Sequence, residues 1–305
     1  MPVNDTMSQL KERAIKFIVN PVSGNGRSRR VLPKLVGVAK KLGVNFDLQF
    51  TQAPEHATEI AKDQSGDFDV MVAVGGDGTV NEVAAGVIKG EKVMGVIPTG
   101  TGNDFAHAIG RLRTLHDYLK RIAYGRIKTI DVGNIRIDNN DLLFVNGLGI
   151  GFDAEVARES LSVHRLRGIT RYLYALLKTL SKYKSPNMRI EIDGRVIDGK
   201  TFLIAVGNGT SAGGGFLLTP AASLDDGLLD TCIVSDVSIK RVLQVLPSVL
   251  NGTHAKHPEV TMIKTGSMKI ESDIPVTLHR DGEIPPSKTS RMEIKVVPNC
   301  LKITV

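Results

Sequence analysis

Short apolar segments alternate with helix-like segments through the first 130 residues, and this alternation constrains the fold more than any other feature. Four short segments, three of them rich in Val and Ile, are expected to be strands: residues 15–20, 45–50, 69–74 and 92–97. Helices are expected between them, at residues 28–42, 55–62 and 79–88. Buried apolar strands that alternate with helices are typical of a parallel α/β sheet.

The pattern changes near Asp131, where strand-like segments and turn residues take over. Asp193-Gly194 lies between two alternating segments and predicts a hairpin. Further strands are expected at residues 200–206, 228–234, 267–272, 275–280, 291–297 and 301–305, with helices near 168–183 and 238–250. The predicted fold is therefore α/β: an N-terminal parallel-sheet α/β domain at residues 1–130, which the last few residues of the chain rejoin, and a C-terminal antiparallel β-sandwich domain at residues 131–305.

Composition narrows the class of ligand. The chain has 305 residues, a formal net charge of +7 and a pI near 9.3, which favours an anionic partner such as nucleic acid, a membrane surface or a phosphorylated compound. With no Trp and 5% aromatic residues, the chain is poorly supplied with platforms for stacking single-stranded nucleic acid. A membrane or a nucleotide is therefore the favoured partner.

The remaining features of composition predict an ordinary cytosolic protein. No apolar run is long enough to span a membrane, and the N-terminus has no signal-like apolar segment. Cys232 and Cys300 are too few and too far apart for a disulfide framework or a zinc site, so we expect buried, reduced thiols. His254 and His257 lack a third ligand partner and are expected at the surface.

Three glycine-rich turns follow predicted strands, at residues 20–30, 75–81 and 98–106. The carboxyl ends of parallel strands share one edge of a sheet, so these turns are expected to converge there. Amides at glycine-rich helix starts bind anions, and several such turns together could hold a polyphosphate, with Thr79 as a helix cap. Any single turn could equally be an ordinary tight connection between a strand and a helix. Two G-x-G-x-x-A patterns, at 149–154 and 207–212, lack the context of a dinucleotide site and are interpreted as chance.

The three turns resemble a known family in their order and spacing. "NPVSG", "GGDGTVNEV" and "PTGTGNDFA" are similar to the nucleotide domain of the diacylglycerol kinase catalytic family, especially the soluble bacterial lipid kinases. The resemblance continues through "SLDDGLLD" at 223–230 and "HRDGE" at 279–283. NAD kinases and some phosphofructokinases share the GGDGT turn, whereas the GTGND turn and the late DGE favour the lipid kinases.

The resemblance implies ATP and Mg²⁺ as cofactors. Asp77 would bind the magnesium ion that bridges the phosphates, because hard cations prefer oxygen ligands. The residues implied to contact the nucleotide or its metal are Asn20, Pro21, Val22, Ser23, Gly24, Thr51, Gly75, Gly76, Asp77, Gly78, Thr79, Val80, Asn81, Thr101 and Glu283.

Two further aspartate turns acquire roles from the resemblance. Asp281 would be the base that accepts the proton of the lipid hydroxyl, in a β domain that forms the other wall of an interdomain cleft, although Asp-Gly is also an ordinary hairpin turn. Asp226, with the carbonyls of Ser223 and Leu228, would hold a structural magnesium ion, although Asp-Asp-Gly is also a turn. Asp104 belongs either to a supporting network or only to the start of its helix.

The resemblance also implies a membrane-lipid substrate, with diacylglycerol as the default, at the inner membrane surface. Residues 160–184 contain no acidic residue, and Ile169, Leu173, Leu176, Leu177 and Leu180 fall at helical spacing, which fits peripheral membrane contact or an ordinary core helix. The six basic residues of this segment are Arg165, Arg167, Arg171, Lys178, Lys182 and Lys184. Related bacterial kinases form dimers, so a homodimer is possible. The alternatives are a soluble-substrate kinase similar to NAD kinase and a non-catalytic nucleotide-sensing module; nucleic-acid binding lacks a reader motif.

Overall fold

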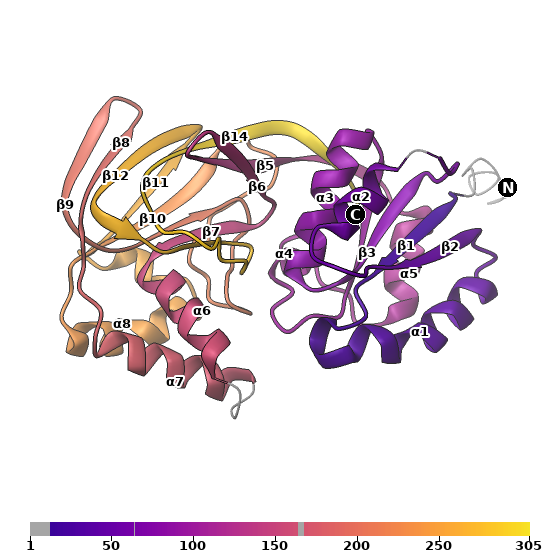
Figure 1. The fold of residues 1–305 in the computed structure, drawn as a ribbon, viewed down its shortest axis with the longest axis horizontal. Coiled ribbons are helices and arrows are strands. Elements are labelled where there is room, and N and C mark those ends of the chain that lie inside the picture. Colours follow the sequence, from indigo (N-terminus) through magenta and orange to yellow (C-terminus); the bar gives the residue numbers. More distant parts are fainter. Residues whose placement is uncertain (1–12, 64, 164–167) are drawn as a thin grey trace, which may run out of the picture. The chain divides into compact units, whose positions relative to one another are not determined.

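The structure of the protein is a computed structural model that describes residues 13–63, 65–163 and 168–305. The chain divides into two compact units. The first unit contains the described residues up to Gly100, together with Ile109–Thr129 and Leu301–Val305. The second unit contains Thr101–Ala108 and Ile130–Cys300. Figure 1 shows the elements of each unit.

The first unit is built on a parallel sheet. Its strands are β1 (Ile15–Val19), β2 (Phe46–Phe50), β3 (Val70–Gly75) and β4 (Val93–Pro98), and the end of β14 (Thr289–Thr304) pairs with β4. Their order in the sheet is β2-β1-β3-β4-β14. Every residue of β3 is buried, as expected for a central strand between layers of helices. The four predicted strands are confirmed, each to within one residue.

Helices cover this sheet, as the sequence predicts. They are α1 (Ser23–Lys41), α2 (His56–Lys62), α3 (Asp77–Gly90) and α5 (Leu115–Tyr124). Leu35 of α1 and Leu119 and Ile122 of α5 pack in one core cluster with the alternating inward residues of β1 and β3. We did not predict α5, although Thr114 caps it by accepting a hydrogen bond from the Asp117 N–H at 3.2 Å.

The second unit is an antiparallel β-structure. Its strands are β5 (Ile127–Ile137), β6 (Asn140–Phe144), β7 (Gly147–Gly151), β8 (Asn187–Ile192), β9 (Arg195–Gly207), β10 (Leu229–Ser235), β11 (Val260–Thr265), β12 (Ser267–Val276), β13 (Leu278–Arg280) and most of β14. The predicted hairpin is confirmed, because Ile192 pairs with Arg195 across a two-residue loop whose Asp193 and Gly194 both have positive φ. The first half of β9 pairs with β8, and its second half lies between β7 and β10. Strand β9 therefore belongs to both layers of the sandwich.

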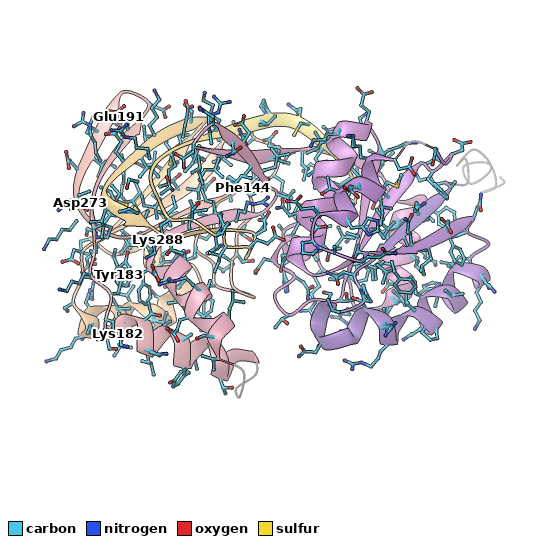
Figure 2. The ribbon with its side chains drawn as sticks, in the orientation of Figure 1. Phe144, Lys182, Tyr183, Glu191, Asp273 and Lys288 are labelled. Carbon is cyan, nitrogen blue, oxygen red and sulfur yellow. The ribbon has the colours of Figure 1, made fainter. Side chains whose placement is uncertain are left out.

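Within the described residues, the helices of the second unit are α4 (Asp104–Ala108), α6 (Phe152–Ser162), α7 (Gly168–Leu180) and α8 (Ile239–Val249), and the short 3₁₀ helix η1 (Thr253–Lys256) follows α8. A hydrophobic cluster joins α6, α7 and α8 to β9 and β10. A second cluster, which includes Phe144, fills the space between the strands (Figure 2). The predictions missed α6, the strands β5 to β7 and strand β11.

Burial tests the predictions for the cysteines and for His254. Cys232 is buried and Cys300 is partly buried, and both are free thiols, as expected. His254 was predicted at the surface, which is wrong: it is buried, and its Nε2 lies 3.2 Å from the Leu218 carbonyl oxygen. Within the described ranges, none of the helices combines the length and the apolar character needed to cross a membrane.

Candidate active site

The three glycine-rich turns are joined by hydrogen bonds at the carboxyl ends of β1, β3 and β4, through residues that all belong to the first unit. The Asn20 amide donates to Thr79 Oγ1 at 3.1 Å, which links the first turn to the second. The N–H of Thr99 donates to the Gly75 carbonyl at 2.8 Å, which links the second turn to the third. Ser28 Oγ and Thr99 Oγ1, both buried, lie 2.6 Å apart and link the first turn to the third. The predicted convergence of these turns is therefore present.

The first turn begins α1 with an irregular backbone. Gly24, Asn25 and Gly26 are consecutive left-handed residues, with φ of 58°, 55° and 76°. Gly24 needs to be glycine for a second reason, because a Cβ built on it would overlap the carbonyl oxygen of Thr99. The step from right-handed Ser23 to left-handed Gly24 is the αR–αL backbone geometry of a small anion site. The predicted residues Asn20 to Gly24 thus lie in a turn suited to phosphate.

The second turn places Asp77 in the first turn of α3, directly after Gly76, which is the N-cap residue. We expected Thr79 to cap this helix, and that is wrong: Gly76 provides the cap position and Thr79 lies inside the helix, buried, where it receives the Asn20 hydrogen bond. Val80 is also buried, and its N–H donates to the Gly76 carbonyl. Of the residues predicted in this turn, Gly76, Asp77 and Gly78 are partly exposed and Asn81 is buried.

Two other predicted nucleotide residues are Thr51, which follows β2, and Thr101, which lies in the third turn. The N–H of Thr51 donates to the Val19 carbonyl at 2.9 Å, so Thr51 follows β2 at the end of β1. Thr101 belongs to the second unit together with Asp104. Asp104 is buried and accepts hydrogen bonds from the Gly214 N–H at 3.0 Å and from Ser211 Oγ at 3.4 Å. These bonds favour a supporting network over a role limited to the start of α4.

Asp281 lies in a tight turn after β13, and its carboxylate is bonded to the backbone. Asp281 and Gly282 both have positive φ, and Arg280 and Glu283 exchange backbone hydrogen bonds at 2.8 Å, so the segment is the hairpin turn that Asp-Gly suggests. Its carboxylate also accepts hydrogen bonds from the N–H groups of Val145, Asn146 and Gly147, at 2.8, 2.9 and 2.8 Å. The connection between β6 and β7 therefore fixes the orientation of this carboxylate.

Burial raises the pKa of Asp281, and the three backbone N–H groups oppose that rise without cancelling it. A carboxylate with a raised pKa is a stronger proton acceptor than an ordinary one. Glu283 is more exposed, and its Oε2 lies 3.4 Å from the Arg280 guanidinium. The structure thus holds Asp281 in a buried, fixed position and Glu283 at the edge of the same turn.

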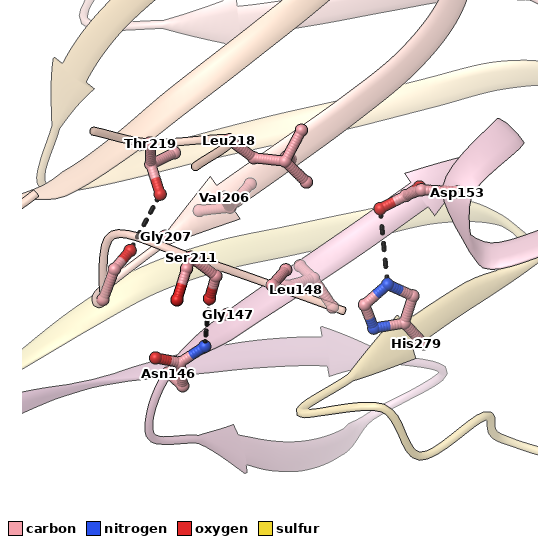
Figure 3. Close-up of a pocket in the computed structure, with 13 residues that line it drawn as sticks. Asn146, Gly147, Leu148, Asp153, Val206, Gly207, Ser211, Leu218, Thr219 and His279 are labelled. Carbon is pink, nitrogen blue, oxygen red and sulfur yellow. Dashed lines mark hydrogen bonds and ion pairs between the residues drawn. The ribbon is translucent and has the colours of Figure 1, made fainter. Parts of the chain in front are cut away.

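A pocket in the second unit is lined by Asn146, Gly147 and His279, among others (Figure 3). The N–H groups of Asn146 and Gly147 donate to the Asp281 carboxylate, and His279 precedes Asp281 by two residues in the chain. His279 Nε2 lies 3.3 Å from Asp153 Oδ2, and both side chains are mostly buried. Burial lowers the pKa of His279, but the hydrogen bond and charge of Asp153 raise it more, so the net shift is upward. Gly149 makes room for this pair, because a Cβ there would overlap both side chains.

The pocket also contains two polar atoms without partners among the described residues, Asn146 Oδ1 and His279 Nδ1. The other end of the Asn146 amide donates to the Ser211 carbonyl at 2.8 Å. Buried polar atoms are usually hydrogen-bonded, so a ligand or a water that bonds here would satisfy them. Sequence reasoning missed Asn146, Asp153 and His279. The alternating glycines of β7, at 147, 149 and 151, were the only hint.

Asp131 is a second residue that sequence reasoning missed. It is fully buried, and its carboxylate accepts hydrogen bonds from the N–H groups of Gly227 and Asn299, at 2.7 and 2.8 Å. Its own N–H donates to the Leu224 carbonyl at 2.7 Å. A lone aspartate in an apolar strand gave no direct signal for this role, because its partners lie far away in the sequence.

The segment predicted to hold a structural metal already has a cation. Asp226 Oδ2 lies 2.7 Å from the ammonium of Lys264, and Asp226 Oδ1 accepts a hydrogen bond from the Leu228 N–H at 3.2 Å. Ser223 Oγ donates to Asp225 at 3.0 Å. The metal site formed by Ser223, Asp226 and Leu228 stays a prediction, and Lys264 was not part of it.

Comparison with known proteins finds a family model for each half of the chain. Residues 14–135 match the diacylglycerol kinase catalytic domain, and residues 146–305 match the YegS C-terminal NAD kinase beta sandwich-like domain. A diacylglycerol kinase of Staphylococcus saprophyticus is 31% identical over 90% of this chain and 90% of that relative. A diacylglycerol kinase of Staphylococcus aureus strain MRSA252 is 31% identical over 90% of this chain and 87% of the relative.

Solved structures share the fold over nearly the whole chain. A crystal structure of a Bacillus anthracis protein superimposes with a TM-score of 0.78 at 25% identity, covering 96% of this chain and 97% of that one. The crystal structure of a diacylglycerol kinase from the same organism gives a TM-score of 0.72 at 22% identity, with the same coverage, and supports the fold alone.

Proposed function

This chain belongs to the diacylglycerol kinase catalytic family and is a lipid kinase, and from that premise we propose that it transfers the γ-phosphate of ATP, with Mg²⁺, to the hydroxyl of diacylglycerol. The observation that carries the proposal is the pairing of two features. Three glycine-rich turns are hydrogen-bonded together in the first unit, and a buried, backbone-bound carboxylate, Asp281, lies in the second.

The turns of the first unit would bind the triphosphate. Their amides lie at the starts of α1 and α3, where the helix dipole favours an anion. Asn20 and Thr79 hold the first two turns in register through their side-chain hydrogen bond. Because Thr79 and Val80 are buried, we propose that they shape the second turn and that Gly76 to Gly78 present its N–H groups.

Asp77 would bind the magnesium ion. Its carboxylate lies at a helix N-terminus, where it would compete with a phosphate for the same positive end of the dipole. A hard divalent cation between the two removes that conflict, and carboxylate oxygen is a ligand that Mg²⁺ prefers. When bound, the ion would neutralise charge on the transferred phosphoryl group.

Asp281 would accept the proton of the lipid hydroxyl. As the hydroxyl oxygen forms a bond to the γ-phosphorus, the bond from that phosphorus to the bridging oxygen of ADP breaks, and the proton passes to the carboxylate. Its fixed orientation and raised pKa suit this role. The adjoining pocket, with Asn146 and His279, would receive polar atoms of the lipid next to that hydroxyl.

A panel of acceptors tests the function directly. Purified protein is incubated with γ-labelled ATP, Mg²⁺ and mixed micelles of diacylglycerol, other glycerolipids, polyprenols or sphingoid bases, and with NAD as a soluble acceptor. We expect label in phosphatidic acid, none in NAD, and none without Mg²⁺. Label only in another lipid would overturn the choice of diacylglycerol, and label in no lipid would overturn the proposal.

Two neighbouring helices of the second unit would contact the membrane that holds the substrate. Helices α7 and α8 pack on one hydrophobic cluster, and neither contains Asp or Glu. Each also has large apolar side chains directed to solvent, between 42% and 58% exposed. These side chains are Leu173, Tyr174, Leu177, Ile239, Leu243 and, just after α8, Leu250. We call this set of residues the apolar helix face.

Exposed lysines flank the apolar helix face: Lys182, labelled in Figure 2, and Lys184 follow α7, and Lys240 lies on α8. Apolar side chains beside exposed lysines, on helices that themselves contain no acidic residue, fit an anionic lipid surface. Glu159 and Glu259, from neighbouring segments, pair with Lys178 of α7 and Arg241 of α8. Leu176 and Leu180, which we had also considered for the membrane, are buried in the core instead. Arg165 and Arg167 lie outside the described residues.

Vesicle sedimentation tests this contact. The double variant Leu177→Glu/Leu243→Glu should lose most binding to vesicles that contain phosphatidylglycerol, because it places charge on both helices. Val196→Glu/Ile274→Glu is the matched control, since Val196 on β9 and Ile274 on β12 are 49% and 51% exposed, outside the apolar helix face. Equal binding by both variants would contradict the proposal. A homodimer stays a prediction, which sedimentation velocity would check.

A further inference from the structure

The ammonium of Lys264 lies among oxygens of residues 221–230, which form the loop that leads into β10 and the first two residues of that strand. Strands β10 and β11 are antiparallel, and their register puts Asp230 directly opposite Lys264. From there the Lys264 ammonium reaches three oxygens: Asp226 Oδ2 at 2.7 Å, Asp230 Oδ2 at 3.0 Å and the Ala221 carbonyl at 3.2 Å. The ammonium donates hydrogen bonds to Asp226 and to the Ala221 carbonyl, and it forms an ion pair with Asp230.

These contacts do not suit a divalent metal at the same loop. An ion bound to Asp226 would lie beside the Lys264 ammonium, and the two positive charges would repel each other. The other oxygen of Asp226 accepts the Leu228 N–H and closes the turn.

We propose that the ammonium of Lys264 takes the place of the structural magnesium ion in this loop, so that the fold of the loop does not depend on a divalent cation. The lysine is fixed in register on β11, whereas a metal must be recruited from solution.

A chain of hydrogen bonds connects this loop to Asp281. The loop is held by Asp131, through the Gly227 N–H and the Leu224 carbonyl. The Asn208 amide then donates to the carbonyls of Asp131 and Val145, both at 2.8 Å. The Val145 N–H donates in turn to the carboxylate of Asp281. On the proposed function, Lys264 is therefore a positioning residue for the strand end that holds the base.

Thermal melting with and without metal tests the replacement itself. We expect the wild-type melting temperature, in the absence of nucleotide, to be the same in EDTA and in millimolar Mg²⁺ or Ca²⁺. Lys264→Met should melt about 2–4 °C lower in EDTA, since it leaves Asp226 and the buried Asp230 without their cation. Mg²⁺ or Ca²⁺ should then restore part of the loss, because the vacated oxygens suit a hard cation.

Lys269→Met is the matched control, because Lys269 is an exposed lysine on β12 and its loss changes the net charge equally. It should show neither the loss nor the response to metal. A wild-type protein that is stabilised by Mg²⁺, with the response abolished by Asp226→Asn, would overturn the replacement. So would a Lys264→Met protein that melts like the wild type, or one that metal does not stabilise.

Kinetics test the positioning role separately. Lys264→Met should lower kcat for the lipid severalfold with the KM for ATP unchanged, and Lys264→Arg, which keeps the charge, should restore part of it. Equal kcat for the wild type and Lys264→Met would overturn the positioning role and leave the melting result standing. If the wild type phosphorylates no lipid, the proposed function fails, and the metal replacement is still decided by melting.

Discussion

The two units build their candidate sites in opposite ways. In the first unit, the site consists of turns that directly follow β1, β3 and β4, and backbone groups provide most of it. In the second unit, the site depends on side chains that meet from distant segments: Asp281 bonds to the β6–β7 connection, and His279 bonds to Asp153 at the start of α6. Backbone N–H groups suit an anionic ligand such as a polyphosphate, and side chains in fixed positions suit a single oriented proton transfer.

This difference implies that the two sites should respond differently to substitution. A backbone site is damaged by changes that alter the chain path, and it tolerates most changes to exposed side chains. A site made of buried side chains is damaged by changes of charge or hydrogen bonding, even when the shape is kept. The predictions below test that contrast, beginning with the largest expected effect.

Asp77 is the exception in the first unit, because its proposed role depends on its side chain. Asp77→Asn should lower the rate of lipid phosphorylation about 10²–10³-fold and raise the Mg²⁺ concentration needed for half-maximal rate, since it removes a ligand charge. Initial rates measured across a Mg²⁺ titration check this. Asp47→Asn, on an exposed residue of β2, is the control. An unchanged Mg²⁺ requirement would remove Asp77 from metal binding.

Gly24 tests the backbone character of the first site. Gly24→Ala should weaken ATP binding by about tenfold or more, equivalent to about 1.4 kcal/mol, because the new methyl group would displace the Thr99 carbonyl. Gly26→Ala is the matched control: Gly26 also has positive φ, but a Cβ there meets open space. Calorimetric titration with ATP compares the two. Similar losses in both variants would show that strain in the chain path, rather than the contact with Thr99, decides affinity.

His279 tests the second unit through pH. The pKa of His279 is raised in the folded protein, so its ion pair with Asp153 stabilises the fold fully below about pH 6.5, and this contribution is lost as pH rises through the folded pKa. His279→Gln should therefore cost about 1–2 kcal/mol at pH 6 and less at pH 9. Urea unfolding at both pH values measures the difference. A cost that grows with pH would mean that the histidine is neutral in the fold.

Much of the first unit could be predicted because its signals are local. Buried parallel strands appear as short apolar runs, and the three turns that follow them are glycine-rich. Helix α5 was missed because its apolar spacing lies beyond the last predicted strand, outside the repeating pattern. Thr79 was assigned as a cap because sequence alone does not show that α3 begins at Asp77.

The second unit was harder to predict because its decisive contacts are distant in sequence. Helix α6 begins inside the segment at 149–154 that was interpreted as a chance glycine pattern. The partner of Asp153 is His279, which lies on β13, far away in the sequence. Strand β14 was predicted as two strands, because Pro298 and Asn299 suggest a break. Asn299 has a positive φ, but β14 continues through it, and the Asp131 carboxylate accepts the Asn299 N–H. The Lys264 contacts depend on the register of β10 and β11, which no local pattern reports.

The most direct test of the division of roles is single-turnover transfer by Asp281→Asn at saturating ATP and diacylglycerol. We predict a rate about 10²–10⁴-fold below that of the wild type. Affinity for ATP should stay close to the wild-type value, as the control for binding, and the melting temperature should fall modestly because the amide nitrogen cannot accept the backbone hydrogen bond that the second carboxylate oxygen accepts. Transfer within tenfold of the wild-type rate, in a protein that binds ATP normally, would contradict the assignment of Asp281 as the proton acceptor.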